Sequence, residues 1–173
     1  MTIVGIDLGT TTGFARLVVN NPLGDSICAL SIPLASQKLL SALKRTRGPR
    51  ALRDYDPRPK YLKAALAQQI QCCPGPIKIY FEDVQFAKSL AQAQLWSSLR
   101  GAMWTLDAEF VAVPVQTLKA FAKAAGQSKA DMADALKHTL PLARLENADD
   151  NQIDAIWLVL YGLSCETHRS NES

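Results

Sequence analysis

The chain has 173 residues, of which 48% are apolar and 20% are charged, so it is long enough and apolar enough to bury a core of its own. Its net charge of +3 excludes nucleic-acid binding through bulk charge, and any such binding would depend on local clusters of cations. The sequence contains no run of about 18 apolar residues and no leader pattern of an exported protein, and its cysteines lack metal-ligand spacing. We therefore expect a soluble cytoplasmic protein with reduced thiols and no membrane partner.

Residues 3–13 join an apolar strand to a turn rich in glycine and threonine, and the strand carries one acid, Asp7. A charge within an apolar run costs several kcal/mol unless it is paired, hydrogen-bonded or bound to a metal. Asp7 is thus either a carboxylate that accepts hydrogen bonds from the backbone of the turn, or a metal ligand on the first strand of a nuclease or ATPase sheet. Residues elsewhere in the chain must decide between the two.

Alternating and helical apolar patterns predict the later elements. Strands are expected at 14–19 and 26–33, which complete an antiparallel meander, and at 77–84 and 109–115. Helices are expected at 61–71, 89–106, 116–125, from Ser128 onward, and at 155–163. Ser128 and Asp131 have capping-box spacing at the start of the fourth of these helices. We expect one domain over residues 1–173, with a polar, frayed tail at 164–173.

Residues 44–63 contain eight basic residues and two acids, interrupted by glycine and prolines, which predicts a mobile basic loop at 44–60. A charged segment of this kind can be a solvated loop without a partner. Its density of arginine nevertheless favours contacts with phosphates. The arginines expected to bind DNA are Arg45, Arg47, Arg50 and Arg53.

Acids at the ends of two predicted strands, Asp7 and Glu82, and at the start of an apolar helix, Asp150 and Asp154, are what a two-metal phosphodiester site requires. At about 100° per residue, Asp150 and Asp154 lie roughly 40° apart and share a helix face. Acids in a first turn also stabilise the helix dipole without any catalytic role. That alternative accounts for Asp150 but not for Asp154, which lies deeper in the apolar helix. Lys129, at another helix start, could meet a phosphate.

These motifs together resemble the RuvC-type Holliday junction resolvases of the ribonuclease H-like superfamily, especially compact phage forms. The resemblance spans residues 3–163 and implies an α/β fold with a mixed five-stranded sheet and helices on both faces. It also implies that Asp7, Glu82 and Asp154 are metal ligands, that Lys129 is the active-site lysine and that Lys119 contacts DNA. The motifs that carry it are Gly5-Ile6-Asp7-Leu8-Gly9, Phe81-Glu82-Asp83-Val84, Pro114-Val115-Gln116-Thr117-Leu118-Lys119, Ser128-Lys129-Ala130 and Asp150-Asn151-Gln152-Ile153-Asp154-Ala155.

The sequence departs from the family pattern at two positions. Many members have an acid or histidine where this chain has Asn151, and we expect Asp150 to substitute as a catalytic metal ligand. The family's aromatic wedge falls at Gln85 here, so Phe86, one residue later, is the candidate wedge, and Lys88 is a further candidate DNA contact. The resemblance also implies a homodimer with the 89–106 helix in or near its interface.

The predicted activity is hydrolysis of four-way or other branched DNA, with two Mg²⁺ ions per active site that Mn²⁺ can replace. The products would carry 5′-phosphate and 3′-hydroxyl ends. Two alternatives remain open. Asp7-Leu8-Gly9-Thr10-Thr11 also resembles the phosphate-binding turn of actin-like ATPases and sugar kinases, although these need two such domains. The other alternative is a catalytically inactive protein that binds junctions through its basic segment.

Overall fold

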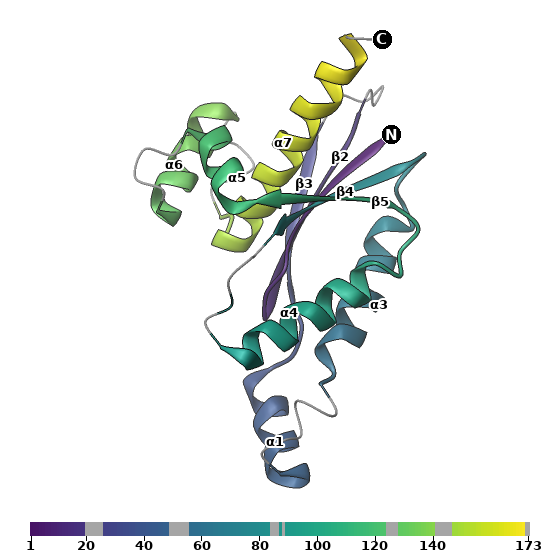
Figure 1. Ribbon diagram of the computed structural model, residues 1–173, viewed down its shortest axis with the longest axis vertical. Coiled ribbons are helices and arrows are strands. Elements are labelled where there is room, and N and C mark those ends of the chain that lie inside the picture. The colour runs from purple at the N-terminus through teal and green to yellow at the C-terminus, as the bar shows by residue number, and fades with distance from the viewer. Residues whose placement is uncertain are drawn as a thin grey trace.

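The computed structural model describes residues 1–19, 26–48, 56–83, 87, 89–123, 128–140 and 147–171. For residues 170 and 171 it describes the backbone alone. A mixed five-stranded sheet in the order β3-β2-β1-β4-β5 forms its centre (Figure 1). The strands are β1 (Thr2–Asp7), β2 (Thr11–Val18), β3 (Ile27–Pro33), β4 (Ile77–Asp83) and β5 (Glu109–Pro114). The first three strands pair antiparallel, whereas β4 pairs parallel to both β1 and β5. The predicted sheet and its opening meander are confirmed.

Helices cover both faces of the sheet, as predicted (Figure 1). One face carries α5 (Val115–Ala122), α6 (Lys129–Thr139) and α7 (Asp150–Asn171), and the other carries α3 (Arg58–Ile70) and α4 (Leu90–Met103). The alternation of β1 produces this division, because Ile3 belongs to the core under α7 while Val4 and Ile6 belong to the core under α3 and α4. No helix in the described ranges has both the length and the apolar character needed to cross a membrane.

Two glycines of the sheet allow α7 to lie directly on β1 and β2. A Cβ atom at Gly13 would overlap the backbone carbonyl oxygen of Asn151, and one at Gly5 would overlap that of Ala155. Asn151 and Ala155 are one turn apart on the same side of the helix. The start of α7 is therefore held against the end of β1 by backbone contact that leaves no room for side chains.

The basic segment at 44–60 is not a loop throughout, which corrects the sequence prediction. A helix, α1 (Gln37–Arg47), includes Arg45 and Arg47 in its last turn, and Arg58 already belongs to α3. The Ser36 side chain caps α1 by accepting a hydrogen bond from the backbone N–H of Leu39 at 3.2 Å. Arg50 and Arg53 lie outside the described residues.

The frayed tail predicted at 164–173 is also wrong for the part that the structure describes, because α7 continues to Asn171. Glu166 explains the extension, since its carboxylate pairs with the buried Lys78 at 2.9 Å and accepts a hydrogen bond from the Tyr80 hydroxyl at 2.7 Å. Gly162, one turn earlier, lies against the Tyr80 ring. Contacts with β4 thus hold the second half of the helix on the sheet.

The close approach of α7 predicts that Gly13→Ala lowers the free energy of unfolding by at least about 2 kcal/mol, because the new methyl group must displace backbone. Gly101→Ala is the matched control, since Gly101 lies in α4 with nothing within 4 Å of an added Cβ. That substitution should stabilise the protein by about 0.5–1 kcal/mol through helix propensity. Urea unfolding measures both, and equal effects would contradict the packing described.

Candidate active site

The carboxyl ends of β1 and β4 open into a pocket that the starts of α5 and α6 and the first turns of α7 complete. Acidic side chains reach it from three different elements, and two lysines also line it. The residues that line it are Asp7, Glu82, Val115, Leu118, Lys119, Ser128, Lys129, Met132 and Asp154. The pocket therefore brings together three of the four acids that the sequence suggested as metal ligands, together with both candidate lysines.

Strand alternation decides which acid of β4 enters the pocket. Glu82 has the same parity as Tyr80, whose ring lies in the core beneath α7. Asp83 points to the opposite face, where it forms an ion pair of 3.0 Å with Arg100 of α4. Only Glu82 lines the pocket, in agreement with the expectation that just one of the two adjacent acids can face Asp7.

The three pocket acids repel one another in a partly buried place. Burial, followed by the charges of Asp154 and Glu82, raises the pKa of Asp7 from 3.8 to about 7. Burial and the charge of Asp154 also raise the pKa of Glu82. The pKa of Asp154 is raised mainly by burial, while Lys129 and Lys119 act in the opposite direction. The pocket thus holds an excess of negative charge that its lysines offset only in part.

The donor chemistry of the pocket fits a hard divalent cation, because carboxylate oxygens are the ligands that Mg²⁺ and Mn²⁺ prefer. A cation would also relieve the repulsion that raises the pKa of Asp7. Within the described ranges, no three His, Cys, Asp or Glu side chains already have the mutual arrangement of a metal site. The fit therefore rests on charge and on the kind of ligand, and the ligand roles remain predictions.

Asp150 does not line the pocket, although its charge helps to raise the pKa of Asp154. The Asp150 side chain is 58% exposed and forms an ion pair of 3.3 Å with Lys129. Sharing a helix face with Asp154 was therefore not enough to bring it into the pocket. The role of Asp150 as a metal ligand stays a prediction.

No protein-family model and no curated protein sequence matches this chain. Solved structures do resemble it. Thermus thermophilus RuvC in complex with a Holliday junction substrate has a TM-score of 0.64 and 15% sequence identity, over 92% of this chain and 91% of that one. A second Thermus thermophilus RuvC structure has a TM-score of 0.61 and 15% identity, over 92% of both chains. A fowlpox virus resolvase bound to Holliday junction DNA has a TM-score of only 0.44 with 11% identity, over 95% of this chain and 98% of that one.

The chain has the RuvC fold. The likeness covers the whole ribonuclease H-like sheet and its helices, which confirms the fold that the sequence motifs implied. At 15% identity it concerns the fold alone, so the roles of individual residues depend on the geometry described above. Within this RuvC fold the pocket lies where the parallel strands β1 and β4 both end.

The structure describes only three of the candidate DNA-binding residues. Lys119 lines the pocket from α5, and Arg45 and Arg47 belong to α1, away from the pocket. The others, Arg50, Arg53, Phe86 and Lys88, fall outside the residues that the structure describes.

The sequence analysis did not identify Ser31 and Asp149 as a pair that anchors α7. Ser31 Oγ on β3 donates hydrogen bonds to the Asp149 carboxylate at 2.7 and 2.6 Å. Asp149 and Gln152 also exchange hydrogen bonds of 3.0 and 3.2 Å between side chain and backbone N–H in a capping box. Burial would raise the pKa of Asp149, but these hydrogen bonds, led by that of Ser31, lower it. The spacing of Asp149 and Gln152 was the available signal, whereas the contact with Ser31 spans 118 residues.

Removing the Ser31 hydroxyl should loosen the start of α7. We expect Ser31→Ala to lower the free energy of unfolding by about 1 kcal/mol, because Asp149 loses a hydrogen bond at an exposed position. Ser98→Ala is the matched control, since its hydroxyl only bonds back to the Gln94 carbonyl within α4. Thermal unfolding of the two variants measures the difference, and equal stabilities would show that the contact with β3 contributes nothing.

The ionisation of Asp7 should make the metal-free protein less stable as the pH rises. Its pKa of about 7 in the folded state exceeds the value of 3.8 expected when unfolded, so the folded state loses stability as the pH rises from about 4 to about 7. Asp7→Asn cannot ionise and should exceed the wild type in stability at pH 8 with EDTA by up to about 4 kcal/mol. The difference should shrink toward pH 5.

The exposed Asp134 provides the control for this experiment, since Asp134→Asn should leave stability at both pH values almost unchanged. Added Mg²⁺ should stabilise the wild type more than Asp7→Asn, because only the wild type keeps the full set of pocket acids. Greater stability of the wild type at pH 8 in EDTA would contradict the electrostatic account of the pocket.

Proposed function

We propose that this protein is a Mg²⁺-dependent endonuclease that cuts four-way junctions and other branched DNA. The observation that carries the proposal is the convergence of Asp7, Glu82 and Asp154, from three separate elements, in one pocket of a RuvC fold. The solved RuvC structure in complex with a Holliday junction supports this class of substrate. Mn²⁺ is expected to replace Mg²⁺, with two ions per active site.

The pocket residues have distinct proposed tasks. Asp7, Glu82 and Asp154 would hold the divalent ions, with Asp150 as the fourth candidate ligand. When bound, such ions supply an activated water and stabilise the charge on the leaving oxygen. The acids also orient the site, because each is fixed by its strand or helix before DNA arrives. Hydrolysis of the phosphodiester bond would leave a 5′-phosphate and a 3′-hydroxyl.

Lys129 is suited to contact the scissile phosphate. It is the first residue of α6, where the Ser128 cap satisfies one backbone N–H and the positive end of the helix favours an anion. Burial would lower the pKa of Lys129, but the Asp150 carboxylate raises it, so the ammonium group remains charged. Asp150 would thereby hold the cation in position until a phosphate competes for it. Lys119, on the opposite wall, would contact the DNA backbone.

Further DNA contacts and a dimer belong to the same proposal. Phosphates would be bound by Arg45, Arg47, Arg50, Arg53 and Lys88. Phe86 would act as the wedge at the junction centre.

A homodimer would place two active sites on opposite strands. The exposed apolar side chains Leu90 and Trp104, 75% and 57% accessible at the two ends of α4, support this helix as the dimer contact. The protein would act in the cytoplasm.

Cleavage of a synthetic four-way junction tests the proposal. We expect Mg²⁺-dependent cleavage by the wild type and a loss of about 100-fold or more in rate for Asp7→Asn and for Asp154→Asn, because each removes a proposed ligand. Asp134→Asn, an equally conservative change of an exposed acid on α6, should cleave like the wild type.

Other outcomes would decide against the nuclease. Equal rates for the wild type and Asp7→Asn would overturn the proposed metal site. ATP turnover without DNA cleavage would favour the actin-like alternative. Tight junction binding without cleavage, in both Mg²⁺ and Mn²⁺, would favour an inactive junction-binding protein.

A further inference from the structure

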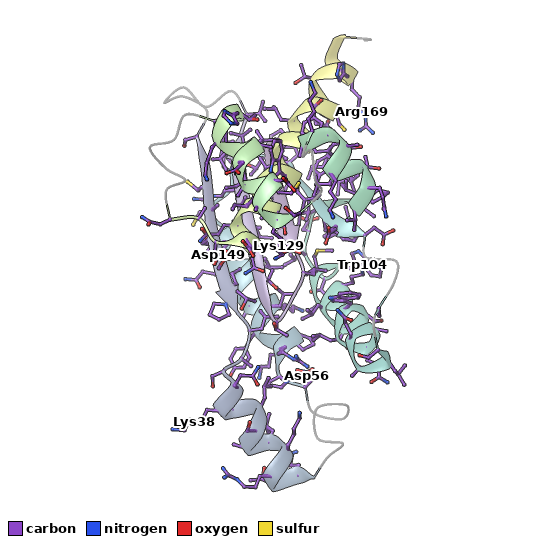
Figure 2. The ribbon with its side chains drawn as sticks, turned by 90° about the vertical axis from the view of Figure 1, so that its left-hand side faces the viewer. Lys38, Asp56, Trp104, Lys129, Asp149 and Arg169 are labelled. Atoms are coloured by element: carbon purple, nitrogen blue, oxygen red, sulfur yellow. The ribbon has the colours of Figure 1, made fainter. Side chains whose placement is uncertain are left out.

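Helix α1 begins at the same edge of the sheet as the pocket. The helix follows β3, whose last residue, Pro33, pairs with Thr11 of β2. Asp7, the last residue of β1, pairs with Gly13, only two residues farther along β2, so β1 and β3 end at the same edge. From this edge α1 projects away from the sheet, as Figure 1 shows. Figure 2 shows Arg169 toward one end of the molecule, Lys129 and Asp149 near its middle, and Lys38 toward the other end. DNA that leaves the pocket in this direction would pass α1.

All the charged side chains of α1 are cationic. Lys38, Lys44 and Arg45 are exposed, and the helix contains no acid. Among the residues that the structure describes, none of these three side chains forms an ion pair. Lys38 and Arg45 are seven residues apart and therefore lie on one side of the helix, two turns and about 10 Å from each other.

Stabilisation of the helix itself accounts for only part of this charge. Cations in the last turn, such as Lys44 and Arg45, interact favourably with the negative end of the helix dipole. Lys38 is in the first turn, where a cation is unfavourable and where α1 has no acid to offset it. An anion bound outside the helix would offset this unfavourable position of Lys38.

One buried side chain and one cap anchor the first turns of the helix. Leu40, on the side of α1 away from Lys38, is only 7% exposed. Leu34, in the short connection from β3, is 1% exposed and belongs to the core beneath α3 and α4. The Ser36 cap fixes the first turn. A segment that is already helical loses less backbone entropy on binding than an unstructured one would.

We propose that α1 binds the phosphate backbone of one duplex arm of the DNA, outside the cleavage site, through Lys38, Lys44 and Arg45. This inference rests on the proposed function and adds to it a surface that selects substrates with an extended duplex arm. The helix is about 16 Å long, which corresponds to roughly five base pairs at 3.4 Å each. The surface contributes affinity and substrate selection, and the chemistry stays in the pocket.

Junctions of two arm lengths test this proposal. One has arms of about 15 base pairs, and the other has arms of about 3 base pairs closed by hairpin loops, shorter than the reach of α1. Binding is measured in an Asp7→Asn background, so that no cleavage intervenes, and the test variant carries Lys38→Ala and Arg45→Ala. Its control carries Lys137→Ala and Arg169→Ala, which remove the same charge from the ends of α6 and α7.

We expect the test variant to bind the long-armed junction about 10-fold or more weakly, and the control to bind it like the parent. The slope of log affinity against log salt concentration should become shallower by about 2, because two phosphate contacts are lost. On the short-armed junction the test variant and the parent should bind alike. Far-ultraviolet circular dichroism and thermal unfolding verify that the test variant is folded.

Each contrary outcome has a separate meaning. If the test variant binds long arms like the control while the wild type still cleaves junctions, α1 does not bind an arm, and the proposed nuclease activity stands without the Arg45 contact. An equal loss on both junctions overturns the assignment of α1 to a site beyond the pocket. If the wild type neither binds nor cleaves either junction, the proposed function itself fails, and the inference falls with it.

Discussion

The contact of α7 with the backbone of β1 and β2 determines where the acids of the pocket lie. Gly5 and Gly13 leave no side chain between the strands and the carbonyl oxygens of Ala155 and Asn151, so the first turns of the helix lie directly on the sheet. Asp154, between these two helix residues, is thereby brought beside Asp7. Ser31 fixes the same turn from β3 through Asp149, and Glu166 fixes the other half of the helix on β4.

This arrangement has an energetic cost that is informative about function. Three carboxylates with raised pKa values in one partly buried pocket oppose folding at neutral pH when no cation is present. The buried core on both faces of the sheet and the anchored helix provide the stability that offsets this cost. Strained electrostatics of this kind are concentrated at functional sites. A purely structural role for Asp7 as a turn carboxylate would not require Glu82 and Asp154 to face it.

Much of this could be predicted from the sequence, because the relevant signals are local. Short apolar runs and alternating patterns identified the strands, and the capping spacing of Ser128 and Asp131 located the start of α6. Helix α1 was missed because its last turn runs into a basic segment with Gly48 and prolines that indicates a loop, and because Leu40 is its one buried residue. The extension of α7 and the contact of Ser31 with Asp149 depend on partners 86 and 118 residues away, for which a single sequence contains no signal. The ion pair of Asp150 with Lys129 is likewise a tertiary contact.

The central claim is that Asp7, Glu82 and Asp154 together bind divalent cations. A crystal structure of the protein grown with Mn²⁺, with anomalous data collected at the manganese absorption edge, tests it most directly. We expect an anomalous peak in the pocket within about 2.6 Å of carboxylate oxygens from these residues. An anomalous map with manganese bound elsewhere, and none in the pocket of well-ordered crystals, would contradict it.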